Sequence, residues 1–233
     1  MAPKAFPPVP DGPWPVGFQT LELAKGGRRV QGCVWYPAGA RGGAPRAYFT
    51  QADAAAQAAA SRARGAPEPD TALLTRLPSQ ARPDAPPAKG AFPLVVFNHG
   101  AGLGPLANVS LMESLASWGL VAACVGHAQE SAALVWRDGS STLIRPDLIA
   151  WMQTPPEARA PFLRILLAQE EAARRQALAA FMQADNGHLR TLSRLWAQDS
   201  LALVDGLFAD GDDPPTEDLR GALDRKRLIY GGM

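Results

Sequence analysis

Residues 92–125 constrain the fold more than any other part of the chain. Residues 94–97 form a continuous apolar run, typical of a strand that is buried on both faces. Residues 106–118 then carry apolar side chains at helical spacing, and Gly119 stands where a helix-ending glycine is expected. Residues 120–125 are a second apolar strand. A strand, a helix and a strand in this order predict a mainly parallel sheet covered by helices.

The rest of the chain predicts further elements on both sides of this unit. Gly26-Gly27 joins two alternating segments, residues 17–24 and 28–36, and indicates an antiparallel hairpin. Asp138-Gly139 indicates a second, small hairpin. Helices are predicted over residues 52–64, 156–185, 192–208 and 216–223, a loop over 67–90 and a last strand over 227–231.

Proline marks the arms and linkers of the chain. There are 22 prolines in 233 residues, about twice the average usage, and they crowd the first fifteen residues and the stretch from 67 to 93. We therefore expect residues 1–16 to be an extended arm. Residues 17–233 then form one α/β domain with a helical insertion around 131–190.

Composition excludes several classes of function. Basic and acidic residues number 23 and 22, so no charged field predicts a nucleic-acid partner. No apolar run is long enough to span a membrane, and no signal peptide precedes the first prolines. These features favour a cytoplasmic location, although a secreted or periplasmic protein whose signal peptide has been removed would have the same sequence features. Cys33 and Cys124 each lie in an apolar strand pattern, which predicts buried free thiols.

The segment His99-Gly100-Ala101-Gly102 follows a buried strand directly and is the clearest complete motif. Acyl transfer builds a negative oxygen in its transition state, and backbone N–H groups aimed at that oxygen stabilise it. Glycines let the backbone approach a substrate closely. We interpret this segment as an oxyanion-hole loop in which the His99 ring braces the loop. An ordinary glycine-rich turn is the alternative.

The segment Gly231-Gly232-Met233 comes after the last predicted strand and downstream of the oxyanion loop. Gly232 and Met233 match the first two positions of a G-x-S-x-G nucleophile elbow, which lies between a strand and a helix. A strand that simply ends in glycine is the alternative. On the elbow interpretation the nucleophilic serine would be the residue after Met233.

Two further positions are candidates for a binding pocket. His127 lies at the carboxyl end of the second buried strand, the edge where open α/β sheets bind ligands. Capping of the following loop is the alternative role for His127. Trp136 is a candidate for lining an apolar acyl pocket, with core packing as its alternative. No histidine has the spacing of a metal site, and no P-loop pattern is present.

The order of five segments resembles the platelet-activating-factor acetylhydrolase-like branch of the α/β-hydrolases, with the dienelactone-hydrolase-like enzymes as near relatives. The segments are residues 12–17, 34–37, 92–102, 115–123 and 223–227. This resemblance implies an α/β-hydrolase three-layer sandwich. Its sheet would be mostly parallel with an antiparallel N-terminal hairpin, and its C-terminal strands would lie outside this chain.

The resemblance also implies an activity: a calcium-independent serine esterase without a cofactor, acting on short or oxidised acyl esters. The family's oxyanion N–H donor falls on Ala101, which lies between Gly100 and Gly102. His127 and Trp136 remain pocket candidates from the sequence pattern alone. The family's Gly-His-Ser elbow falls on Gly232 and Met233, with methionine where histidine is common.

The three members of the Ser-Asp-His triad would then follow residue 233. They would lie in a following segment or in a companion chain that begins with serine. None of His99, His127 and His188 matches the catalytic histidine. The alternatives are a non-catalytic binding domain and an inactive, truncated fragment of a hydrolase.

Overall fold

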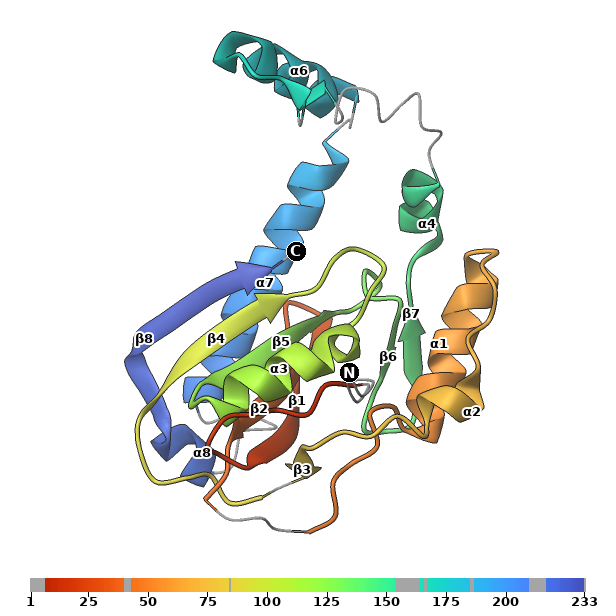
Figure 1. Ribbon diagram of the computed structural model, residues 1–233. Coiled ribbons are helices and arrows are strands. Elements are labelled where there is room, and N and C mark those ends of the chain that lie inside the picture. Colours follow the sequence, from red (N-terminus) through yellow and green to blue (C-terminus); the bar gives the residue numbers. More distant parts are fainter. Residues whose placement is uncertain are drawn as a thin grey trace, which may run out of the picture. The chain divides into compact units, whose positions relative to one another are not determined.

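The structure is a computed structural model that describes residues 7–39, 43–83, 85–153, 164–165, 167–184, 187–209 and 217–232 (Figure 1). The chain divides into two compact units. The first unit comprises residues 1–144 and 199–233, and the second comprises residues 145–198. The candidate functional residues that the structure describes all lie in the first unit.

The first unit is built on a six-stranded sheet with the strand order β3-β1-β2-β5-β4-β8. The strands are β1 (Val16–Lys25), β2 (Arg28–Pro37), β3 (Arg82–Pro83), β4 (Phe92–Asn98), β5 (Val121–His127) and β8 (Leu223–Gly232). A separate antiparallel hairpin consists of β6 (Ala133–Val135) and β7 (Ser141–Leu143). Both predicted hairpins are therefore confirmed.

The N-terminal hairpin forms because its turn residues accept positive φ angles. Gly26 and Gly27 have φ angles of 59° and 77°, which a two-residue turn between antiparallel strands requires. β1 and β2 pair along their whole length, from Val16 opposite Pro37 to Lys25 opposite Arg28. The predicted antiparallel start of the sheet is confirmed.

The centre of the sheet is parallel, as predicted. β4 pairs in parallel with β5 on one side and with β8 on the other. Two features of the sheet were not predicted. The first is that β2 pairs with β5 in antiparallel orientation. The second is the two-residue strand β3, which lies within the segment predicted to be a loop and pairs with β1. A strand of two residues is too short to show a side-chain period, so the sequence does not reveal it.

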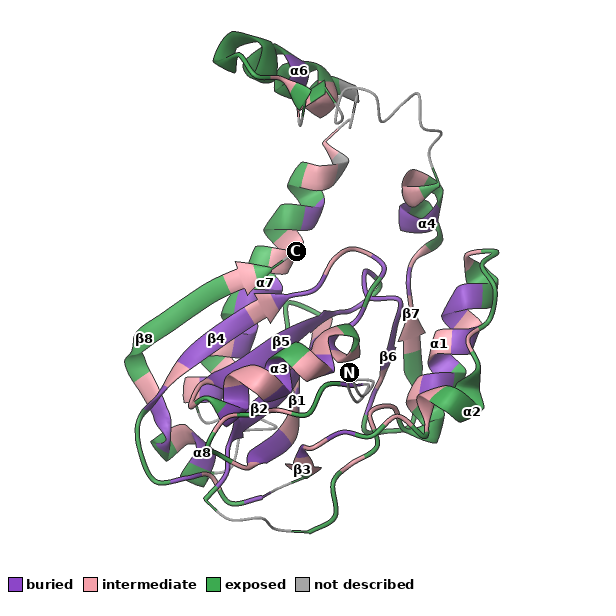
Figure 2. Cartoon of the chain, in the orientation of Figure 1, coloured by how far each residue is buried: buried purple, intermediate pink, exposed green. Residues whose placement is uncertain are grey.

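Helices cover both faces of the sheet, which gives the predicted three layers. The helices of the first unit are α1 (Gln51–Ala63), α2 (Thr71–Leu74), the 3₁₀ helix η1 (Pro105–Asn108), α3 (Val109–Ser117) and α8 (Glu217–Gly221). α3 packs on one face, over Trp35 and Cys124. α8 and the last part of α7 (His188–Phe208) pack on the other face, over Val34 and Val96. Figure 2 shows β2, β4 and β5 as the buried centre.

The second unit contains α4 (Pro146–Met152), α6 (Glu171–Ala184) and the beginning of α7. Residues 156–163, 166 and 185 of the helix predicted over residues 156–185 lie outside the described residues. Residues 168–170 are not helical, so the prediction of one continuous helix is wrong there, and α6 is its described C-terminal part. No helix in the described part of the chain has the length and apolar character needed to cross a membrane.

Two details of the first unit bear on later arguments. Cys33 and Cys124 are buried and free, as predicted. β8 lies at the end of the described sheet, and three large side chains near its carboxyl end are exposed: Leu228, Ile229 and Tyr230. Figure 2 shows this strand as mostly exposed, in contrast to its neighbour β4.

Candidate active site

The candidate site lies where β4, β5 and β8 reach their carboxyl ends. Asn98, the last residue of β4, is paired with Gly232 of β8 on one side and with Val125 of β5 on the other. The predicted oxyanion loop begins at the next residue, His99. Ligands bind at the carboxyl ends of strands in open α/β sheets, so this loop occupies the expected edge.

Within this loop, neighbouring backbone N–H groups differ in whether they donate a hydrogen bond to the protein. Gly102 N–H donates to the Glu130 carbonyl at 3.1 Å, and Leu103 N–H donates to the Gly100 carbonyl at 3.0 Å. Ala101 is only partly buried, and its N–H makes no hydrogen bond to any described residue. Gly102 has a φ of 72°, a conformation that favours glycine and turns the loop sharply after Ala101.

The structure describes only part of the predicted nucleophile elbow. Met233 lies outside the described residues, so its assignment to the nucleophile elbow stays a prediction. Gly232 is described, and it lies beside Asn98, three positions before Ala101 in sequence. The carboxyl end of β8 therefore reaches the strand end from which the oxyanion loop starts.

The fully buried ring of His99 braces the loop. Its Nδ1 lies 2.9 Å from the Gly100 carbonyl oxygen, which only accepts, so Nδ1 carries the proton and donates. Its Nε2 is then the acceptor for the Ser131 hydroxyl at 2.8 Å. Ser131 Oγ accepts in turn from the His127 N–H at 3.1 Å. This chain of bonds ties the loop to the end of β5.

Burial, together with the nearby His127, lowers the pKa of His99 to about 4, although the hydrogen bond to the Gly100 carbonyl acts in the opposite direction. The ring is therefore neutral near pH 7. A neutral ring is what the bracing geometry needs, because Nε2 accepts a hydrogen bond only when it is unprotonated.

His127 lines neither of the two described cavities, and it is fully buried in a polar network. Its Nδ1 lies 2.8 Å from Asp199 Oδ2, and its Nε2 lies 2.8 Å from Asn98 Oδ1. Asn98 Nδ2 donates to the Tyr230 hydroxyl at 2.8 Å, and Ser200 donates to Asn98 Oδ1 at 3.1 Å. The network joins the ends of β4, β5 and β8 to α7.

Ionic groups complete the network. Arg28 donates from Nε and Nη2 to the two carboxylate oxygens of Asp199, both at 2.8 Å, and it also pairs with Glu130. The side chains of Asp199 and Glu130 are 2% and 0% exposed. Burial by itself would raise the pKa of Asp199, but hydrogen bonds from His127 and Arg28 lower it, so the carboxylate stays charged.

His127 experiences opposing influences in this network. Burial lowers the pKa of the ring, while the hydrogen bond that the ring donates to Asp199 and the negative charges of Asp199 and Glu130 raise it. Burial has the larger effect, and the pKa is lowered overall. His127 thus fixes the strand ends rather than offering a nitrogen to a ligand.

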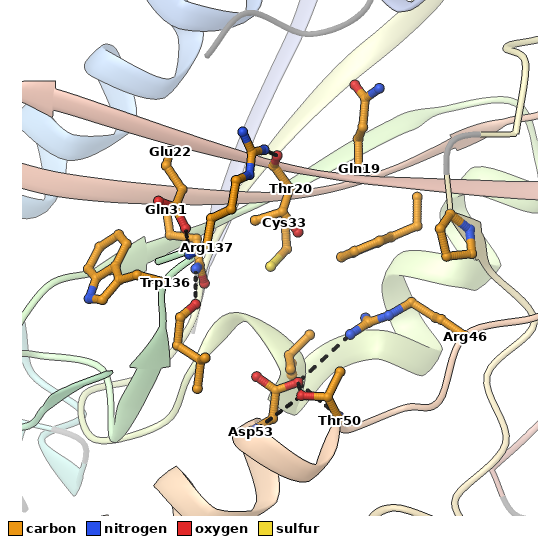
Figure 3. Close-up of a pocket in the computed structure, with 14 residues that line it drawn as sticks. Gln19, Thr20, Glu22, Gln31, Cys33, Arg46, Thr50, Asp53, Trp136 and Arg137 are labelled. Carbon is orange, nitrogen blue, oxygen red and sulfur yellow. Dashed lines mark hydrogen bonds and ion pairs between the residues drawn. The ribbon is translucent and has the colours of Figure 1, made fainter. Parts of the chain in front are cut away.

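Trp136 is the one predicted site residue that borders a described cavity. The cavity has a volume of about 550 Å³ and lies between β1, β2, the start of α1 and the β6–β7 hairpin (Figure 3). Trp136 Nε1 donates to Thr142 at 2.8 Å, which fixes the ring in the wall. None of residues 99–102 lines this cavity, so Trp136 and the oxyanion loop belong to different places in the unit.

The sequence interpretation missed several members of the network, among them Arg28, Asn98, Asp199, Ser200 and Tyr230. Asn98 gave a usable signal, since a polar residue ends an apolar strand there. Asp199 gave none, because an aspartate on a helix usually faces solvent. Among the described residues, no group of three or more His, Cys, Asp or Glu side chains is placed to hold a metal ion.

Acidification is expected to destabilise the protein through His99. The pKa of the ring is about 4 when folded and about 6.5 in a model peptide, so the unfolded state binds more protons between these values. The contribution of the neutral His99 to stability is therefore fully present above pH 6.5 and is lost as the pH falls toward 4. The loss at pH 4.5 is about 2.5 kcal/mol.

Denaturant titrations of the wild-type chain and of His99→Asn at pH 7 and pH 4.5 test this. The free energy of unfolding should fall less between the two pH values in the variant, which lacks the buried imidazole. The same pH dependence in both proteins would contradict a buried neutral His99.

The parallel centre of the sheet, the helices on both faces and the loop after β4 define the chain as a protein of α/β-hydrolase fold. A ferulic acid esterase from Streptomyces cinnamoneus is a similar solved structure, with a TM-score of 0.57 and 20% sequence identity. The alignment covers 96% of this chain and 53% of that structure. The chain therefore spans about half the length of this relative.

A family model matches the chain over residues 73–159: platelet-activating factor acetylhydrolase, isoform II. The matched range contains β4, the predicted oxyanion loop, α3 and β5. The resemblance to the platelet-activating-factor acetylhydrolase-like branch, inferred from the motifs, is confirmed by this match. A search of curated proteins found no match.

Proposed function

We propose that this chain is part of a serine carboxylic ester hydrolase, to which it supplies the oxyanion-hole loop and half of the sheet. The observation that carries the proposal is the Ala101 N–H. It makes no hydrogen bond to a described residue, on a loop whose next two N–H groups are bonded and whose first residue is braced. The family match and the likeness to an esterase fold support the same class of reaction.

In this proposal Ala101 N–H donates to the ester carbonyl oxygen as negative charge develops on it. Gly100 and Gly102 let the backbone approach the ester, and His99 holds the loop in place through Ser131. The pKa of His99 keeps its ring neutral at the pH of the reaction, so the brace persists. The substrate class is short or oxidised acyl esters, and no cofactor takes part.

The nucleophilic serine is proposed to follow Gly232-Met233, in a following segment or a companion chain that also brings the acid and the histidine. β8 supports this placement because its carboxyl end lies beside Asn98, where the oxyanion loop begins. The domain organisation belongs to the same proposal: an arm over 1–16 and one hydrolase domain over 17–233 with a helical insertion around 131–190.

A non-catalytic binding domain is the second candidate. The cavity that contains Trp136 favours it, because this cavity lies apart from the oxyanion loop. The two candidates differ in whether a reactive serine lies next to Met233.

A fluorophosphonate probe, which reacts with activated serines, separates them. The protein is isolated from its source with any segment that continues or accompanies the chain, labelled and digested. Labelling should fall on a serine directly after Gly232-Met233 and abolish turnover of p-nitrophenyl acetate. The 233-residue chain alone should be inactive. Turnover by that chain alone, or a preparation without a labelled serine, would contradict the proposal.

A further inference from the structure

The cavity between the N-terminal hairpin and α1 has the dimensions of a small-molecule site. Its volume of about 550 Å³ falls within the roughly 300–1,000 Å³ of known ligand pockets. β1 and β2 form its floor, the segment before α1 and the start of α1 form one wall, and the turn after β6 forms another (Figure 3). Every lining residue belongs to the first unit.

Arg46 is the lining residue whose bonding is incomplete. Its side chain is 11% exposed, and Figure 3 shows the guanidinium directed into the cavity. The guanidinium makes no hydrogen bond to any described residue, and its Nη1 atom is buried without a partner. A buried charged donor without an acceptor is destabilising, so this arrangement calls for an acceptor that enters the cavity.

Two contacts, neither of which is a hydrogen bond, hold the guanidinium of Arg46 in this position. The guanidinium lies over the Phe18 ring, with Cζ 4.1 Å from the ring centroid. Its Nη2 lies 4.0 Å from Asp53 Oδ2, which is longer than a hydrogen bond. Asp53 accepts from the Thr50 N–H and hydroxyl in the capping box of α1, at 2.9 and 2.7 Å.

Other polar groups around the cavity are already bonded. Glu22 accepts from the Arg137 N–H at 2.6 Å and pairs with Arg29 at 3.3 Å. Gln31 donates to the Val135 carbonyl at 2.7 Å. Arg137, the other cation of the lining, donates to the Thr20 carbonyl at 3.3 Å. Arg46 is therefore the lining cation whose guanidinium makes no hydrogen bond to a described residue, and we take it as the anchor for a ligand.

We propose that the cavity binds a small monocarboxylate, with the carboxylate on Arg46 and an apolar body against the walls. A guanidinium presents paired donors that match the two oxygens of a carboxylate. Two carboxylates, Glu22 and Asp53, also line the cavity, so a phosphate dianion would bring a second negative charge against them, whereas a monocarboxylate brings only one. The apolar side chains of the lining suit an organic body: Phe18, Pro83, Leu106, Val135 and Trp136. The site goes beyond the proposed ester hydrolysis and does not depend on it.

Calorimetric titration of the full 233-residue chain tests the chemical class. The probes are benzoate and octanoate, with benzyl alcohol as the neutral analogue of benzoate and inorganic phosphate as a second anion. Benzoate or octanoate should bind saturably, and benzyl alcohol and phosphate should bind at least tenfold more weakly. Equal binding of benzoate and benzyl alcohol, or tighter binding of phosphate, would overturn the assignment.

Variants then test the anchor. Arg46→Gln should weaken carboxylate binding at least tenfold, and Arg46→Lys should weaken it less, because one ammonium retains the charge but not the paired donors. Arg62→Gln is the matched control, since Arg62 is an exposed arginine of α1 that pairs with Glu68 outside the cavity. It should change binding less than twofold.

Unchanged binding in Arg46→Gln would show that Arg46 serves only to balance Asp53, and it would overturn the proposal. Absence of saturable binding of either carboxylate to the wild-type chain would do the same. If Arg46→Gln does not melt cooperatively, Arg46→Lys and the comparison of benzoate with benzyl alcohol still decide between the outcomes.

Discussion

Replacing Asp199 with alanine is expected to lower the free energy of unfolding by about 3–5 kcal/mol. The carboxylate is 2% exposed, and it accepts two hydrogen bonds from Arg28 and one from His127. Its removal leaves Arg28, whose side chain is 21% exposed, with Glu130 as its remaining ion-pair partner, and it leaves His127 Nδ1 without its acceptor. The penalty therefore comes mainly from the partners that remain buried.

Asp205→Ala is the matched control, because Asp205 lies on the same helix α7 and also pairs with a cation of the hairpin. Its partner is Lys25, and the two side chains are 65% and 60% exposed. An exposed pair contributes at most about 1 kcal/mol. Denaturant titration of both variants measures the difference, and equal losses would contradict a structural role for the buried network.

Replacing Ala101 with proline is expected to lower kcat for ester hydrolysis about 100- to 1,000-fold. Proline has no N–H, so the change removes the donor that the proposed function assigns to the oxyanion. The lost stabilisation of the transition state corresponds to about 3–4 kcal/mol. The measurement is turnover of p-nitrophenyl acetate by the active protein that contains the serine.

Ala101→Gly is the control for this change, since glycine keeps the N–H and alters only the side chain. It should keep kcat within about tenfold of the wild type, which is well above the proline variant. Melting curves of both variants show whether the loop change has spread to the fold. Equal activity of the proline and glycine variants, with both folded, would remove Ala101 from the oxyanion hole.

Much of the fold followed from the sequence because its central strands are buried on both faces. β4 and β5 are continuous apolar runs, and Gly119, with a φ of 90°, ends the helix between them where predicted. The antiparallel join of β2 to β5 did not follow, because strand direction in a sheet depends on long-range pairing rather than on local pattern.

The site was predictable to the extent that it is local. The predicted oxyanion loop is four consecutive residues with recognisable backbone chemistry, whereas the polar network around His127 is assembled from distant parts of the chain. His127 and Asp199 are 72 residues apart, and Arg28 and Asp199 are 171 residues apart. His127 was interpreted as a pocket residue because strand-end histidines often contact ligands, and only the packing of α7 over it shows that it is enclosed.

The pairing of β8 with β4 also determines how late the sheet can be completed while the chain is being translated. β1 and β2 are adjacent and can form their hairpin in about 1–10 μs, but Asn98 and Tyr230 are 132 residues apart. At about 5–20 residues per second, the ribosome needs roughly 7–26 s to supply β8 after β4 has been made. We expect the free edge of β4 to stay accessible on nascent chains throughout this interval, which protease protection of ribosome-bound chains of increasing length would measure.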